Sequence, residues 1–252
     1  MSELKGDSAG VPWQGRHFEP NTSSDDDGSA PETLINAITG FRSGELGQSA
    51  VVEALRDARL LIPLVAVLGA DGLDEHGHDK SQELSIVTVA GPDGRTVLPV
   101  FSSVVAMTQW NPAARPVPAN AQRVALAAAS ESTDVVVLNA TSPTEFVIRR
   151  PALEAIARSQ PWVPSFLDPE VLDAFLTSAS GEAAVVAIQL APGDPDARLA
   201  GPELLVHLTL AAGLDQLALS ALLERLQRRW TESELIASRV DSLGVALAAA
   251  AS

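Results

Sequence analysis

The sequence lacks cysteine and tyrosine altogether. The absence of cysteine excludes disulfide bonds, thiolate metal sites and cysteine nucleophiles. Any bound metal ion would therefore need ligands from histidine and carboxylate side chains.

Positive charge is also scarce. The 252 residues include 17 Lys and Arg against 32 Asp and Glu, which gives a formal net charge of −15 at pH 7. A chain of this charge repels phosphate backbones and anionic membrane surfaces. We therefore expect neither nucleic acid nor a membrane as a partner.

Long apolar segments are missing as well. No run reaches the roughly 18 uninterrupted apolar residues that a membrane-spanning helix needs. The N-terminal region has no basic segment followed by an apolar one, which is the pattern of a cleaved secretory signal. These patterns predict a cytoplasmic protein.

The glycine patterns of nucleotide-binding proteins are absent too. Gly40, Gly44 and Gly47 lack the spacing of a dinucleotide-binding loop and are interpreted as a connection, and no Walker sequence occurs. The run Asp25–Gly28 lacks the alternating acidic positions of a calcium-binding EF-hand loop. We predict no catalytic residue, no cofactor-binding residue and no cofactor, and we do not expect an enzyme.

The composition divides the chain into three parts. Residues 1–30 are rich in Ser, Gly, Asp and Pro, and they predict a disordered acidic N-terminal arm. The chain is 46% hydrophobic, enough for a sizeable core at the border between one domain and two. We predict an α/β (α+β) fold of two small lobes, residues 31–160 and 161–252, each a mixed sheet flanked by helices.

In the first lobe, a helical pattern near Glu45 leads into the apolar stretch 60–68, which predicts a strand. Pro63 within it suits a sheet edge or a bulge, because proline donates no backbone hydrogen bond. Gly91–Gly94 predicts the turn of a hairpin. The other expected elements are strands at 83–89 and 95–101, a helix from a Ser102 or Ser103 cap to Trp110, an extended segment 115–118, a helix over 120–130, strands at 134–139 and 145–148, and a helix over 151–158.

The segment 160–164 is the predicted linker to the second lobe. Asp168 and Pro169 fit the N-cap and the first residue of a helix. Further along, the pattern predicts strands at 183–190 and 203–210, a helix around 219–230 and a last strand near 234–240. This order gives a β-β-α-β lobe.

Several strings of the first lobe resemble the SseB family of bacteria, over about residues 25–158. The strings are the Asp25–Gly28 run, the first strand Leu60–Val67, the segment Lys80–Leu84, Leu98–Ser103 and Trp110–Pro118. The resemblance implies an SseB N-terminal domain, followed by a lobe like the SseB C-terminal domain. The family's names refer to serine sensitivity and to a label shared with type III secretion, and neither specifies a reaction or a catalytic residue.

The loop 71–79 holds the candidates for a metal site. His76, His78, Asp74 and Asp79 are ligands suited to zinc or another divalent ion. A His-x-His pair on a glycine-containing loop has no rigid surroundings to orient it, so a solvated polar loop is the alternative interpretation. His207, at an alternate position of the strand 203–210, is interpreted as a half-buried structural residue.

Four residues are candidates for a binding surface because they lie in the strings that resemble the family. They are Lys80, Glu83, Trp110 and Arg115. Arg115 lies between residues that proline keeps extended, and its guanidinium either forms an internal ion pair or binds a ligand.

These observations lead to two hypotheses. The first is a non-enzymatic binding or scaffolding protein that holds a protein partner at a sheet edge or in a groove between the lobes. The second is a protein that binds a small molecule or a divalent metal at the loop 71–79 or in the cleft between the lobes. Assembly into a homo-oligomer is compatible with either.

Overall fold

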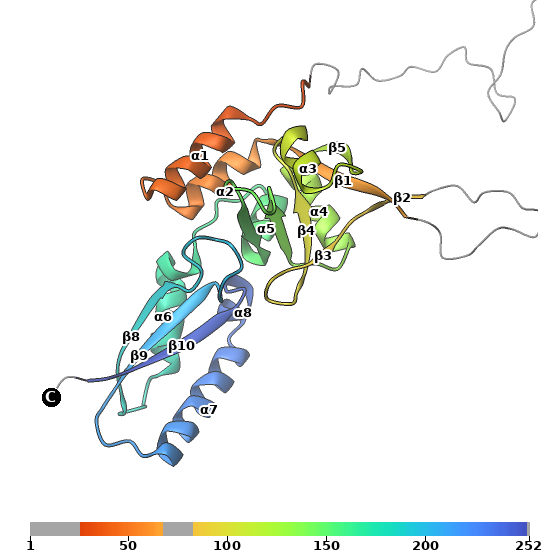
Figure 1. The fold of residues 1–252 in the computed structure, drawn as a ribbon. Helices are drawn as coiled ribbons and strands as arrows, with labels where there is room; N and C mark the ends of the chain where they lie inside the picture. Colours follow the sequence, from red (N-terminus) through yellow and green to blue (C-terminus); the bar gives the residue numbers. More distant parts are fainter. Residues whose placement is uncertain (1–25, 68–82, 251–252) are drawn as a thin grey trace, which may run out of the picture.

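The computed structural model describes residues 26–67 and 83–250 (Figure 1). The fold is mixed α/β, which confirms the predicted class. The first lobe contains α1 (Glu32–Ser43), α2 (Gln48–Arg56), β1 (Arg59–Val67), β2 (Glu83–Ile86), β3 (Val89–Ala90), β4 (Thr96–Val100), α3 (Val104–Trp110), β5 (Arg115–Asn120), α4 (Ala121–Ser130), β6 (Val135–Leu138), β7 (Phe146–Arg149) and α5 (Arg150–Ala157). The second lobe contains the 3-10 turn η1 (Ser165–Leu167), α6 (Pro169–Ser178), β8 (Val185–Pro192), β9 (Leu204–Leu210), α7 (Gln216–Glu232), α8 (Glu234–Arg239) and β10 (Leu243–Ala249).

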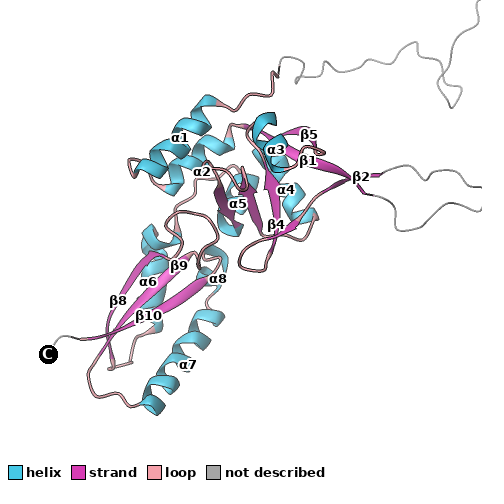
Figure 2. Cartoon of the chain, viewed as in Figure 1, coloured by secondary structure: helices cyan, strands magenta, loops and turns pink. Residues whose placement is uncertain are grey.

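Two sheets form the first lobe, with helices packed against them (Figure 2). One sheet has the order β2-β1-β5 and is antiparallel. The other has the order β3-β4-β6-β7, in which β4 and β6 are parallel. An isolated bridge between Leu61 and Phe101 connects the two sheets. The main core lies where α1, α2, α4 and α5 cover these strands.

Pro63 occupies a position where its missing N–H is tolerated. On one side it is opposite Pro116 of β5, which has no N–H either. On the other side, pairing with β2 begins only at Leu64, and the bridge to Phe101 is at Leu61. β1 is thus the middle strand of its sheet, but it has no ladder partner on that side at Pro63.

Two interpretations of the first lobe were wrong. Gly40 is not part of a connection but lies inside α1, where a side chain would collide with Leu46. The expected strand 83–89 is two strands, β2 and β3, which belong to different sheets. The hairpin itself is confirmed: β3 pairs with β4 around the turn that contains Gly94 at φ 82°.

Residues 26–30, assigned from composition to the N-terminal arm, contact the first lobe. The carboxylate of Asp26 accepts a hydrogen bond from Arg59 at 2.7 Å. The carbonyl of Gly28 accepts one from the N–H of Val104 at 2.9 Å, at the start of α3. Within the described part of the chain, contacts with the first lobe are therefore already present a few residues before α1.

The second lobe is a three-stranded sheet with helices on one face (Figure 1). The strand order is β10-β9-β8, with β10 parallel and β8 antiparallel to β9. Along β9 the buried residues alternate with half-buried ones, so only one face of the strand is fully covered. α6 begins as expected, with the carboxylate of Asp168 accepting a hydrogen bond from the N–H of Glu170.

The last expected strand was placed too early. Residues 234–239 form the helix α8, because Ser233 caps it by accepting a hydrogen bond from the N–H of Ile236. Ile236 and Val240 are four residues apart, so both reach the core from one side of this helical turn. The strand that completes the lobe is β10.

Within the described residues, no helix is long and apolar enough to cross a membrane. The cytoplasmic location stays a prediction.

Phe175 is the central packing residue of the second lobe and gives a first test. It is fully buried, and its ring contacts that of Trp230 edge to face, with 5.2 Å between centroids. We expect Phe175→Ala to lower the free energy of unfolding by about 3–5 kcal/mol, measured by urea denaturation. The neighbouring substitution Leu176→Ala, at a side chain 47% exposed, should change it far less. Equal effects of the two substitutions would contradict this core.

Candidate functional site

Most residues of the predicted metal site lie outside the described residues. These are His76, His78, Asp74 and Asp79, together with Lys80 of the predicted binding surface. Among residues 26–67 and 83–250 no group of three or more His, Asp or Glu side chains is arranged to hold a metal ion. His207 is half-buried on β9, opposite Gln189 and Ala246.

The other predicted surface residues are not gathered into one site. Glu83 begins β2, with its backbone opposite Val67. The ring of Trp110 packs against Phe101, with 5.2 Å between centroids, so this tryptophan supports the small core under α3. Arg115 is exposed at the start of β5, and it forms no ion pair with any other described residue.

One string with the spacing of a catalytic motif was missing from the predictions made from the sequence. Gly6–Gly10 has the G-x-S-x-G spacing of serine hydrolases, and it too lies outside the described residues. The motif acts on a sharp turn between a strand and a helix. The preceding residues Met1–Lys5 lack the apolar run of such a strand.

The structure instead brings together charged side chains from both lobes. Arg149, the last residue of β7, contacts Asp194 at 2.7 Å and Asp241 at 3.1 Å. The guanidinium of Arg95, from the hairpin turn, reaches Asp241 at 2.9 Å. The side chains of Arg149, Asp194 and Asp241 are only 8%, 2% and 3% exposed. We call these four residues the interlobe network.

The loop between β8 and β9 carries Asp194 into the first lobe. The Asp194 carboxylate accepts hydrogen bonds from the N–H groups of Leu199 and Arg198 within the same loop. Ala197 and Leu199, held at φ 48° and 57°, are both buried against first-lobe residues. The carbonyl of Ala197 also accepts a hydrogen bond from the N–H of Val147 at the edge of β7. This loop therefore extends the first lobe's sheet and core.

Arg150, next to Arg149, makes a second connection between the lobes. Its guanidinium donates hydrogen bonds to the carbonyls of Ala237 at 2.6 Å and Val240 at 3.0 Å. These carbonyls lie at the C-terminal end of α8, where helical carbonyls have no partner within the helix and positive charge is favourable. Consecutive arginines thus fix two different parts of the second lobe.

Glu203 extends the network inside the second lobe. Its carboxylate accepts hydrogen bonds from the hydroxyl of Ser165 at 2.7 Å and from the N–H of Asp241 at 2.6 Å. Burial raises the pKa of Glu203 above its ordinary value, and the negative charge of Asp241 acts in the same direction. The two hydrogen bonds oppose this rise without cancelling it.

Arg95 is shifted in favour of its charged form. Burial disfavours the guanidinium charge, but the hydrogen bonds and negative charges of Asp93 and Asp241 outweigh burial and raise the pKa of Arg95. The arginine therefore stays a cation that neutralises the buried carboxylate of Asp241.

The network leaves no room for a substrate. The hollow beside Arg149, Asp194 and Glu203 is bounded by Trp162 and has a volume of about 20 Å³. A hollow of that size has room for about one water molecule. The arrangement therefore has a structural role: it holds one lobe against the other.

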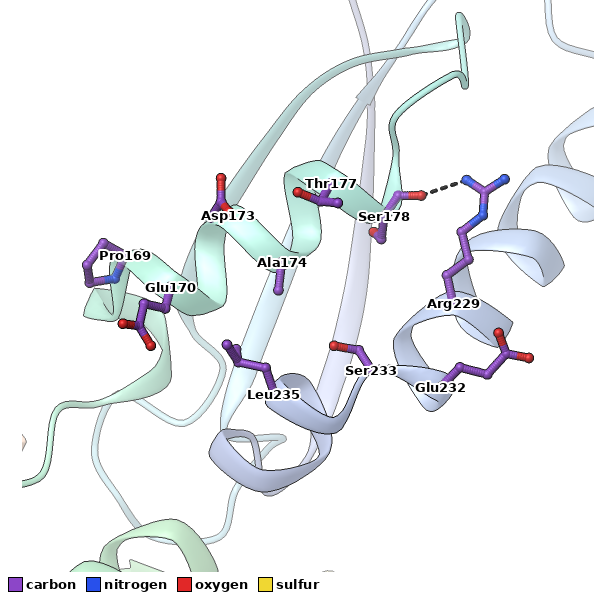
Figure 3. A pocket seen from close by; sticks show the side chains of 10 residues that line it. All are labelled: Pro169, Glu170, Asp173, Ala174, Thr177, Ser178, Arg229, Glu232, Ser233 and Leu235. Atoms are coloured by element: carbon purple, nitrogen blue, oxygen red, sulfur yellow. Dashed lines mark hydrogen bonds between the residues drawn. The ribbon is translucent and has the colours of Figure 1, made fainter.

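Larger hollows lie on the surface. A groove of about 820 Å³ runs between α6 on one side and α7 and α8 on the other (Figure 3). A polar cleft of about 420 Å³ lies between the lobes, lined by residues of α5, the linker and α8, among them Arg158, Trp162 and Arg239. A third hollow of about 450 Å³ lies in the first lobe between the sheet β2-β1-β5 and α4, lined by Leu64, Val117 and Leu126 among others.

The fold and the network define a two-lobed α/β protein whose lobes are fixed together by buried ion pairs. The family model described as SseB protein N-terminal domain matches residues 34–155, the part from α1 to α5. Residues 34–155 of the first lobe thus match the family that the resemblance implied. The match ends before the second lobe, whose likeness to the SseB C-terminal domain stays a prediction. No curated protein and no solved structure matches the chain.

Sequence reasoning did not find the interlobe network. Asp194 and Asp241, which bind Arg149, lie 45 and 92 positions after it in the sequence. No spacing rule relates residues so far apart. One signal was available: Arg149 ends a fully buried strand and Arg150 directly follows it. A charge at the end of such a strand needs a partner, although the sequence does not name it.

Removal of Arg149 tests the network. Arg149→Met replaces the aliphatic part of the side chain but leaves Asp194 without its cation, and we expect a loss of about 3–5 kcal/mol in the free energy of unfolding. Arg158→Met is the control, because Arg158 is 65% exposed and contacts Glu154 at 3.6 Å. An exposed pair of this kind contributes at most about 1 kcal/mol. Similar losses in the two variants, measured by urea denaturation, would rule out a structural role for the network.

Glu203 gives a prediction for pH. Because its pKa is raised in the folded state, the associated stability is present below the ordinary value of 4.5 and is lost as the pH rises through the raised pKa. Glu203→Gln cannot ionise; its amide oxygen can still accept from the N–H of Asp241, and its amide NH2 can donate to the hydroxyl oxygen of Ser165. We therefore expect the stability of the variant relative to wild type to rise as the pH increases from the ordinary value of 4.5 through the raised pKa of Glu203. Glu224→Gln, at an exposed position of α7, controls for the loss of a carboxylate. A difference independent of pH would contradict the burial of an ionisable Glu203.

Proposed function

We propose that the protein is a non-enzymatic binding protein whose second lobe holds a positively charged segment of another protein. The groove between α6 and α7–α8 carries this proposal, because it combines an apolar floor with carboxylates at its rim. Ala174 and Leu235 face each other across the groove (Figure 3). An apolar floor with charged edges suits a basic amphipathic segment.

The charge at the groove is negative after internal pairs are counted. Arg229 is bound to Glu182 at 2.9 Å and to the carbonyl of Ser178 at 2.6 Å. Asp173 and Glu232 both line the groove, and neither has an ion-pair partner among the described residues. These two carboxylates remain available for a cationic partner, and the net charge of −15 would steer such a partner toward the protein.

The groove is held in shape by contacts beneath it. The indole N–H of Trp230 donates a hydrogen bond to the hydroxyl of Ser178 at 2.7 Å and thereby joins α7 to α6. The Phe175 ring packs against the same indole. A groove that is formed before binding lowers the entropy loss of association.

The two serine hydroxyl groups at the groove have structural partners rather than a base. Ser178 donates its hydroxyl to the carbonyl of Phe175 and accepts from Trp230, and Ser233 caps α8. A serine nucleophile needs a general base within hydrogen-bond reach, and no described histidine lines this groove. This arrangement favours binding over catalysis.

Charge reversal at the groove tests the proposal. We expect a fluorescent lysine- and leucine-rich amphipathic peptide to bind the wild type, more weakly at higher salt. The double substitution Asp173→Lys with Glu232→Lys should weaken binding by at least about tenfold, because it replaces attraction by repulsion. The control, Glu45→Lys with Glu224→Lys, changes the net charge equally at exposed positions elsewhere.

Fluorescence anisotropy provides the measurement. Equal weakening in both double variants would show attraction to the overall charge of the chain, and it would overturn the assignment of the groove.

A further inference from the structure

Among the residues that the structure describes, β10 is an edge strand with a neighbour on one side only. The order of the second sheet is β10-β9-β8, so within residues 26–67 and 83–250 β10 pairs only with β9 (Figure 1). The direction of its backbone groups follows from two hydrogen bonds to β9. The carbonyl of Ser242 accepts from Leu204, and the N–H of Ala250 donates to Leu210.

Because backbone groups alternate in direction along a strand, the even-numbered residues of β10 face β9. The odd-numbered residues therefore direct N–H and C=O groups toward the open edge. These residues are Leu243, Val245, Leu247 and Ala249.

The open edge carries none of the features that normally protect such strands. The sequence Leu243–Ala249 has no charged residue and no proline. Val245 and Leu247 are 39% and 46% exposed, although their partners on β9 are fully buried. Exposed, uncharged edge strands pair readily with another strand. The opposite edge strand, β8, has a register shift near its start and ends with Pro192, and both features disfavour pairing.

We propose that β10 binds β10 of a second copy of this chain, antiparallel, with Ala246 opposite Ala246 across a two-fold axis. This interface is separate from the groove of the proposed function. It would join the two three-stranded sheets into one continuous sheet, and the pairing closes at two copies because both contribute the same surface.

The residue pattern around Ala246 is what favours a second copy over a different strand. In this register Val245 of each copy lies opposite Leu247 of the other, so both exposed apolar side chains gain cover. Odd residues lie opposite odd residues, which places every outward N–H opposite an outward carbonyl. On the other face of β10 the residues are Gly244, Ala246 and Ala248, which leave room for the second strand.

Single cysteines test this register directly, because the natural chain has none. Opposed residues of a non-hydrogen-bonded antiparallel pair have Cα atoms about 4.5 Å apart. A disulfide spans about 4.4–6.8 Å, so Ala246→Cys should form a disulfide-linked dimer under mild oxidation.

Ala248→Cys is the matched control on the same face of β10. In the proposed register Ala248 lies opposite Gly244 of the other copy, which separates the two introduced thiols by more than about 7 Å. We expect little cross-linking there, visible on non-reducing gels. Cross-linking of the Ala248→Cys variant but not of the Ala246→Cys variant would overturn the register.

The association itself is measured by analytical ultracentrifugation of the full chain over a range of concentrations. We expect a monomer–dimer equilibrium that Leu247→Lys weakens by at least about tenfold, because it places an unpaired charge in the interface. Val186→Lys, on the exposed part of β8, should leave the equilibrium unchanged. Circular dichroism confirms that each variant is folded. A wild-type chain that stays monomeric, or a dimer insensitive to Leu247→Lys, would overturn the proposal.

Discussion

The ion pair between Arg149 and Asp194 is the interaction on which the arrangement of the two lobes depends. It joins the end of a first-lobe strand to a second-lobe loop, at 2.7 Å and with both side chains buried. A buried charge is costly unless it is paired and hydrogen-bonded. The same two residues meet this condition only when the lobes are in contact. Separation of the lobes would therefore leave unpaired charges, and that cost specifies one relative orientation.

The loop that carries Asp194 explains why the connection is rigid. The Asp194 carboxylate binds backbone N–H groups of its own loop as well as Arg149. Ala197 and Leu199 are held in left-handed backbone conformations and insert into first-lobe cores. A disfavoured backbone conformation persists only when surrounding contacts determine it. The polar, apolar and backbone contacts of this one loop thus all require the first lobe. They fix the orientation of the groove and of the β10 edge relative to the first lobe.

Local sequence patterns predicted those elements whose cause is local. α3 and α6 follow Ser103 and Asp168, whose side chains cap the helix, and both residues were among the predicted caps. The buried strand β6 was visible as a run of apolar residues. α1 was missed because its N-cap residue, Pro31, makes no side-chain hydrogen bond, and because Gly40 has a packing role that only the folded structure shows.

The network could not be predicted, because its partners are brought together only by the folding of both lobes. Arg95 and Asp241 are 146 positions apart and belong to different lobes. No period or motif relates them. The same holds for the groove, whose walls come from α6, α7 and α8, and for the open edge of β10, which depends on the strand order.

The groove and the β10 edge differ in the physical force that each would use. Binding of a cationic segment at the groove depends on charge, so salt would weaken it. Pairing of β10 depends on hydrogen bonds and apolar contacts between two copies that each carry a net charge of −15, so salt would strengthen it by screening their repulsion. A dimer would carry two grooves, and a partner with two basic segments would bind it more tightly than it binds a single chain. Because the groove and β10 belong to the same lobe, pairing of β10 would set the distance between the two grooves, and the spacing of basic segments in the partner would then determine which partners gain from the dimer.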